Sequence, residues 1–186
     1  KYTFLSLAFF NRFIIQFKLI LMKHNNDILY KIIDKGFKAL NKSKKKILIS
    51  YTIDIKNNYK KQLEYIIEKG NMLYFSSPDK TNFIGTSQSI SLDILNKNDL
   101  ISLETFYQDN FHIISNINSE NLYSFGTTAF NLQNKTNIPW ENIPKGKFIV
   151  PKIYFKIKHN KTKLTFTQIL NKKSKVESVA NYIKDE

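Results

Sequence analysis

The chain has 186 residues, of which 42% are hydrophobic, and its 15 Phe and 10 Tyr exclude a disordered polymer in favour of a folded domain. It has no cysteine, which excludes disulfides and thiolate metal sites and favours a reducing compartment, the cytoplasm by default. The net charge of +14 comes almost wholly from lysine, with Arg12 the single arginine, so it fits a compositional bias better than a surface that reads nucleic acid.

Residues 1–21 are expected to lie upstream of the folded core or outside it, and Met22 is a plausible initiator. The run from Phe4 to Leu21 is apolar, but polar residues interrupt it too often for a membrane-spanning helix, and it has no small-residue cleavage site of a signal peptide. We expect no membrane association, with a helix lying on a membrane surface as the alternative.

The first half of the chain alternates predicted helices and strands. A helix should begin at Asn26, because Leu29, Ile32, Ile33, Phe37 and Leu40 form one apolar stripe. Ile47–Ile53 is β-branched and short, which predicts a buried strand. A second helix is expected over Tyr59–Lys69, with Gly70 at its end.

Two strands and a helix are predicted next. Met72–Ser76 and Asn82–Leu92 should be strands joined by a turn at Ser77–Lys80, where Pro78 presets φ. A helix should begin near Asn98 or Asp99. Its expected apolar side comprises Leu100, Leu103, Phe106, Tyr107, Phe111 and Ile114.

The last third is predicted to consist mostly of strands. Leu122–Asn131 should be a strand, with a bulge or close backbone approach at Gly126. Lys147–Lys158 alternates over its second half, and Leu164–Ile169 should return antiparallel after a turn at His159–Thr162. A helix is expected from Ser174. This mixed order predicts an α+β fold, with mostly antiparallel strands and flanking helices.

Two ordered groups of residues resemble the front part of the chorismate-utilising enzymes, and isochorismate synthases in particular. The family has a strand, turn and strand of the type F-Y-F/W-S-S-P-D, followed by a strand with glycine, and a later Gly-Gly-Phe-Ala-Phe-Asp strand, tryptophan and F-x-x-P strand. The first group is matched by Tyr74, Phe75, Ser76, Ser77, Pro78, Asp79 and Gly85. The second is matched by Gly126, Ala129, Phe130, Trp140, Pro144, Phe148, Val150 and Pro151, whereas Thr127, Thr128 and Asn131 depart from it. The resemblance extends from Ile47 to Phe166.

The resemblance implies part of a Mg²⁺-dependent isomerase that converts chorismate to isochorismate, for menaquinone, siderophore or salicylate synthesis. In that family a lysine activates water, a carboxylic acid protonates the leaving group, and glutamates hold Mg²⁺. These groups lie in a later half that opens with a Lys-Val-Val-Leu-Ala/Ser-Arg strand, and the nearest string here, Lys175-Val176-Glu177, does not match it. Mg²⁺ is therefore expected in the full-length enzyme and not on this chain.

The resemblance also implies a domain plan. Residues 22–170 would be the N-terminal region of a chorismate-binding enzyme, and residues 171–186 a linker helix toward the catalytic half. That half and chorismate are the expected partners. We predict no catalytic, cofactor-binding or metal-binding residue on this chain, which by itself should be inactive and tend to aggregate.

The other candidate motifs in the sequence are weak evidence for a functional site. His24, His112 and His159 are too scattered to predict a metal site, and Ser43–Lys46 and Ser77–Lys80 match S-x-x-K without its companion motifs. Trp140 is expected to pin a loop onto the core. The alternative function is a small basic binding module, acting through the lysines of Lys42–Lys46 and Lys152–Lys163, and in its nucleic-acid form through Lys152, Lys156 and Lys158 interleaved with Tyr154 and Phe155.

Overall fold

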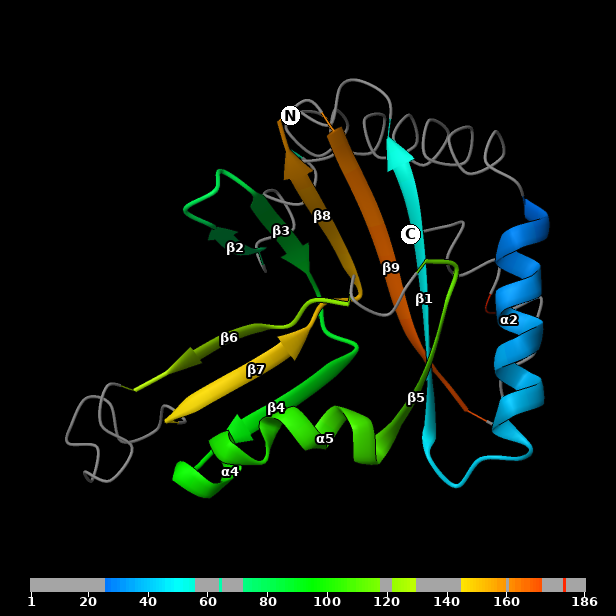
Figure 1. Ribbon diagram of the computed structural model, residues 1–186, viewed down its shortest axis with the longest axis horizontal. Helices are drawn as coiled ribbons and strands as arrows, with labels where there is room; N and C mark the ends of the chain where they lie inside the picture. The colour runs from blue at the N-terminus through cyan, green and yellow to red at the C-terminus, as the bar shows by residue number, and fades with distance from the viewer. Residues whose placement is uncertain are drawn as a thin grey trace, which may run out of the picture.

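The fold is α+β, with two sheets and helices against them (Figure 1). The computed structural model describes residues 26–55, 64, 72–117, 122–129, 145–159, 161–171 and 179. Three predictions concern residues outside these ranges. They are the helix over 59–69, of which only residue 64 is described, the helix from residue 174, of which only residue 179 is described, and the role of Trp140. No helix in the described ranges is long and apolar enough to cross a membrane.

The larger sheet has six strands in the order β2-β3-β8-β9-β1-β5. Their bounds are Met72–Ser76 (β2), Asn82–Thr86 (β3), Ile153–Lys158 (β8), Lys161–Leu170 (β9), Lys46–Ile55 (β1) and Phe111–Ser115 (β5). Neighbouring strands are antiparallel, except that β5 runs parallel to β1. The predicted antiparallel return onto β8 is confirmed, but the predicted turn at His159–Thr162 is too long, because Lys161 and Thr162 already pair with β8.

The main core lies between α2 (Asn26–Leu40) and one face of the large sheet. Figure 1 shows α2 running alongside β1. Leu29, Ile32 and Ile33 are buried there, while Phe37 and Leu40 pack at the edge, so the predicted apolar stripe is confirmed. Since strand side chains alternate between faces, only every second residue of β1 and β9 belongs to this core. The other residues point to the opposite face.

The smaller sheet has the order β4-β7-β6, with β4 at Ile90–Ile94, β7 at Gly146–Val150 and β6 at Phe125–Thr128. Helices α4 (Lys97–Ile101) and α5 (Leu103–Asn110) lie near β4 (Figure 1). A second apolar cluster joins Leu48 of the large sheet to Ile90 and Val150 of the small sheet. The two sheets are therefore packed against each other at this point.

Two predicted strands are each divided between the sheets, which corrects the sequence analysis. Asn82–Leu92 is not one strand, because Ser87 has a positive φ of 58° and the chain passes there from β3 to β4. Lys147–Lys158 is likewise divided at Pro151, which cannot donate a ladder hydrogen bond, between β7 and β8. The two segments in which the chain passes from one sheet to the other are hydrogen-bonded, because the Ser89 amide donates to the Val150 carbonyl at 2.8 Å.

At two of the glycine positions that match the family pattern, a larger residue would clash with a neighbouring side chain. A Cβ at Gly85 would lie 2.7 Å from Cγ of Pro151, where the strands change sheets. A Cβ at Gly126 would overlap the Phe148 ring, which lies directly opposite in the ladder between β6 and β7. Each position requires a close approach that only glycine permits.

The predicted helix near Asn98 is wrong in its bounds. Asn96 is the N-cap, and its side chain accepts from the Asn98 and Asp99 amides. The helix is interrupted at Ser102, and Phe111 and Ile114 belong to β5. Pairing with β1 fixes these two residues in extended backbone, which overrides their helical spacing.

The predicted strand Leu122–Asn131 begins later than expected. Among its described residues, Phe125–Thr128 form β6 and pair with β7, and the Ala129 amide donates to the Lys145 carbonyl beyond the end of the ladder. Residues 130 and 131 lie outside the described residues.

Candidate basic and hydroxyl-bearing site

The face of the large sheet opposite α2 is polar along its centre. Buried hydroxyl residues alternate with the core residues of β1 and β9: Ser50, Thr52, Thr165 and Thr167. The ladder places Ser50 opposite Thr167 and Thr52 opposite Thr165. The same alternation that builds the apolar core therefore builds a row of hydroxyls on the other face.

The residues Thr52, Thr165 and Thr167 of this row are hydrogen-bonded to one another or to neighbouring loops. Thr52 and Thr165 share a buried hydroxyl pair at 2.8 Å. The Asn116 side chain accepts from the Thr52 amide at 2.8 Å and donates to the Thr52 carbonyl at 2.6 Å. Thr167 donates toward Ser89 at 2.8 Å, and Ser89 donates to the Thr167 carbonyl at 2.7 Å. Burial of these polar groups is thus compensated by partners.

An aromatic group lies beside this row and surrounds one lysine. The Lys156 ammonium donates to the Tyr123 hydroxyl at 2.5 Å and lies 4.8 Å from the Tyr123 ring centroid and 5.8 Å from that of Phe83. Tyr123 also packs edge-on against Tyr154. These contacts hold the Lys156 ammonium through cation–π attraction and one hydrogen bond.

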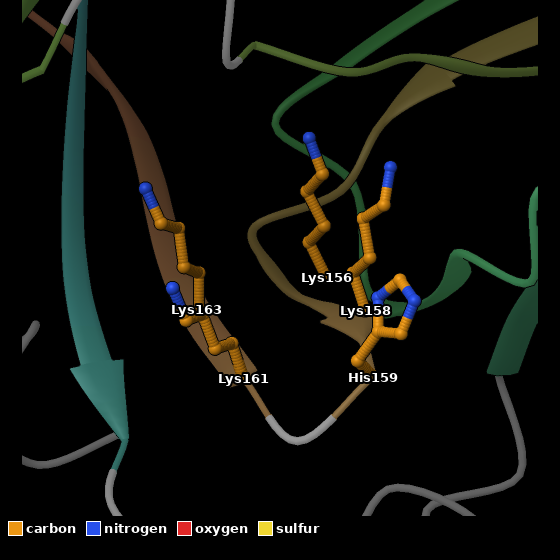
Figure 2. A pocket seen from close by; sticks show the side chains of 5 residues that line it. All are labelled: Lys156, Lys158, His159, Lys161 and Lys163. Carbon is orange, nitrogen blue, oxygen red and sulfur yellow. The ribbon is translucent and has the colours of Figure 1, made fainter.

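Four lysines and a histidine line a hollow of about 490 Å³ at the tip of the β8–β9 hairpin, and we call it the basic hollow. Its residues are Lys156, Lys158, His159, Lys161 and Lys163. Figure 2 shows two lysine side chains rising from each strand, with a gap between the pairs and His159 at the turn. His159 has a positive φ of 53°, as the first residue of a tight hairpin loop requires.

The basic hollow has acidic neighbours on two sides. Lys158 pairs with Asp79 at 2.8 Å, and Asp54 lies directly opposite Lys163 in the β1–β9 ladder. The ion pair with Lys158, together with hydrogen bonds from Thr81 and Ser77, holds the pKa of Asp79 well below its usual range. Among the described residues, Lys161 and Lys163 have no ion pair.

Tyr154 is the most perturbed tyrosine of this face. Burial is the main cause that raises its pKa to about 12, since the ionised phenolate would lose its hydration. Tyr154 is 1% exposed, so it cannot offer its ring to a stacked base, and this corrects its assignment to an open nucleic-acid-binding face. Lys152 is not among the residues that line the basic hollow.

The structure does not bring the other singled-out residues together. His112 is exposed on β5 and His159 at the hairpin turn, while His24 lies outside the described residues. The second S-x-x-K match is a turn, in which the Lys80 amide donates to the Ser77 carbonyl at 2.9 Å. In the described ranges no three His, Asp or Glu side chains are grouped so that they could hold a metal ion.

Sequence reasoning missed the partners that arrive from distant segments. Tyr123 and Phe83 meet Lys156, and Asn116 brackets Thr52, although no local pattern links them. The cross-strand lysine pairs could have been found, because a two-residue loop at 159 and 160 places Lys158 opposite Lys161 and Lys156 opposite Lys163.

The sequence pattern of the family described as chorismate binding enzyme matches residues 35–186, which is most of the chain. The chain belongs to this family. The comparison with curated proteins finds no match. Among solved structures, the chain is similar to MenF, the menaquinone-specific isochorismate synthase from Escherichia coli, at 11% identity and a TM-score of 0.47. That similarity covers 83% of this chain and 33% of the MenF chain, so this chain spans about a third of its length.

The face of the large sheet opposite α2 presents hydroxyl groups and positive charge. Ammonium and hydroxyl groups are the usual partners of carboxylates, and the four lysines of the basic hollow supply the charge. The arrangement is therefore suited to attracting and binding anions.

Proposed function

We propose that this chain is part of an isochorismate synthase, an isomerase that converts chorismate to isochorismate. The family match over residues 35–186 carries the proposal. The ordered resemblance of the turn at Ser77–Lys80 and of the strand around Phe148 to isochorismate synthases supports the finer assignment. A menaquinone, siderophore or salicylate pathway and a cytoplasmic location belong to the same proposal.

In this proposal the chain supplies structure and charge, and another segment supplies the reacting groups. The described residues hold the hydroxyl row in place through Thr52, Thr165 and Asn116. The resemblance assigns the base lysine, the general acid and the glutamates that bind Mg²⁺ to a later half. No step of the reaction is therefore assigned to a side chain of this chain.

The exposed edge strand β2 supports the need for a further segment. Met72, Tyr74 and Phe75 are 41%, 58% and 54% exposed, on a strand that ends the order of the described strands in the large sheet. An edge strand with large exposed apolar groups invites pairing or coverage. We propose that the catalytic segment covers this region of the sheet in the complete enzyme.

Chorismate turnover tests the proposal. The reading frame beyond Glu186 is sequenced, and the 186-residue chain and the complete product of that frame are assayed with chorismate and Mg²⁺ by chromatography. We expect a Lys-Val-Val-Leu-Ala/Ser-Arg strand in the continuation, isochorismate from the complete product, and none from the chain alone. Turnover by the chain alone would refute the division of roles. A complete product that makes a different compound from chorismate would refute the isochorismate synthase assignment.

A further inference from the structure

We propose that the basic hollow at the β8–β9 hairpin is a binding site for a small anion with two or more negative groups, either carboxylates or phosphates. This proposal does not rest on the proposed function, because it concerns the hairpin lysines and needs no chorismate chemistry. The residues that would bind the anion are Lys156, Lys158, Lys161 and Lys163.

The register of the hairpin places like charges directly opposite each other. Lys156 pairs with Lys163 in the ladder, and Lys158 pairs with Lys161. All four side chains leave the same face, as Figure 2 shows. Like charges at directly opposed positions destabilise a sheet, and two such pairs in succession are costly unless an anion lies between them.

The neighbouring acids neutralise only part of this charge. Asp79 pairs with Lys158, and Lys156 is held by the Tyr123 hydroxyl, which is neutral. Lys163 faces Asp54 across the β1–β9 ladder, yet neither Lys163 nor Lys161 has an ion pair in the described part of the chain. Two ammonium groups on β9 are thus available, beside two that are already oriented on β8.

The shape of the site favours a compact ligand over a polymer. The basic hollow has a volume of about 490 Å³, within the range of small-molecule sites. Its lysines are confined to the tip of one hairpin and do not form a long track. Single-stranded nucleic acid would need accessible aromatic rings for base stacking, whereas Tyr154 is buried and Tyr123 is occupied by Lys156 and Tyr154.

The test is a calorimetric titration of the 186-residue chain at constant ionic strength. Pyrophosphate represents the phosphate class and citrate the carboxylate class, with chloride and a single-stranded oligonucleotide as comparisons. The variant K161Q/K163Q removes the two lysines of β9, which have no ion pair in the described part of the chain. The control K31Q/K35Q removes the same charge from exposed positions on α2, which covers the opposite face of the sheet. Circular dichroism verifies that both variants are folded.

We expect pyrophosphate or citrate to bind with one site per chain. K161Q/K163Q should weaken that binding by about tenfold or more, since each ammonium donates a charge-assisted hydrogen bond. K31Q/K35Q should change it by less than about threefold, because distant charges are screened. The tighter of the two anions identifies the ligand class.

Three results would overturn the proposal. The first is no saturable binding of either anion, and the second is an equal loss in both double variants, which would show an effect of net charge alone. The third is an oligonucleotide that binds more tightly than both anions through Lys161 and Lys163, which would make the hairpin a nucleic-acid surface. If K161Q/K163Q is unfolded, the single variants K161Q and K163Q carry the same comparison.

Discussion

The two faces of the large sheet are built from the same strands but differ in chemistry. On the α2 side, β1 and β9 contribute Ile49, Leu164 and Phe166, which are 0 to 3% exposed. On the other side, the alternate residues Thr52 and Thr165 form a buried hydroxyl pair. The α2 face is held mainly by apolar burial, whereas the other face combines the apolar cluster around Leu48 with hydrogen-bonded hydroxyls, so the two should respond differently to substitution.

Because the two faces differ in chemistry, we expect them to have different roles. The described residues of the face closed by α2 are mostly buried apolar side chains, whereas the opposite face has hydroxyls at its centre and ammonium groups at one end. Stability is thus expected to depend mostly on the α2 side, and anion binding on the other side.

The largest expected effect is on the α2 face. Ile49→Ala should lower the free energy of unfolding by about 2–5 kcal/mol, because it removes buried methyl groups and leaves a cavity. The control Ile28→Ala changes the same residue type where the side chain is 40% exposed, and should cost well under half as much. Urea denaturation of the two variants gives both values. Equal costs would show that this core is not closely packed.

A second prediction concerns Tyr154 at alkaline pH. Its raised pKa means that the folded state keeps the neutral phenol, so this stability is complete below pH 10 and is lost as the pH rises toward 12. By pH 11.5 the loss should be about 2 kcal/mol. Tyr154→Phe should lack this loss, as urea denaturation at pH 9 and pH 11.5 would show. Parallel pH profiles for the two proteins would contradict the burial of this hydroxyl.

A third prediction concerns the buried hydroxyl pair. Thr52→Val and Thr165→Val should each cost about 1–3 kcal/mol, because each leaves the other hydroxyl without its partner. The double variant should cost less than the sum of the single costs, with a coupling of at least about 0.5 kcal/mol. A double-mutant cycle by denaturation measures this coupling. Strict additivity would mean that the pair does not form.

The smallest expected effect is at the basic hollow. Without added anion, K161Q/K163Q should stabilise the fold by about 0.2–1 kcal/mol, since it relieves two opposed like-charge pairs. The gain should shrink at high salt, where exposed charges are screened. The control K31Q/K35Q should stay within about 0.5 kcal/mol of the parent chain in thermal unfolding. A destabilised K161Q/K163Q would show that these lysines support the hairpin.

Sequence patterns predicted the elements whose signal is local. The stripe from Leu29 to Leu40 places α2 correctly, since a helix buries every third or fourth residue. The β-branched run at Ile47–Ile53 lies within β1, and the turn at Ser77–Lys80 joins β2 to β3 as expected. Two errors lie at Ser87 and Pro151, where a run that is continuous in sequence changes sheets. Another lies at Phe111 and Ile114, where pairing with β1 overrides helical spacing.

The sequence by itself determined the α+β class, the core stripe of α2, and the alternation that separates Ile157 from Lys158 on β8, because each depends on neighbours along the chain. Only the tertiary structure decided that Thr52 meets Thr165, that Tyr123 and Phe83 enclose Lys156, and that β5 lies parallel to β1. These contacts join residues far apart in sequence. Their register depends on which faces are buried together, and the local hydrophobic pattern of a strand does not contain that information.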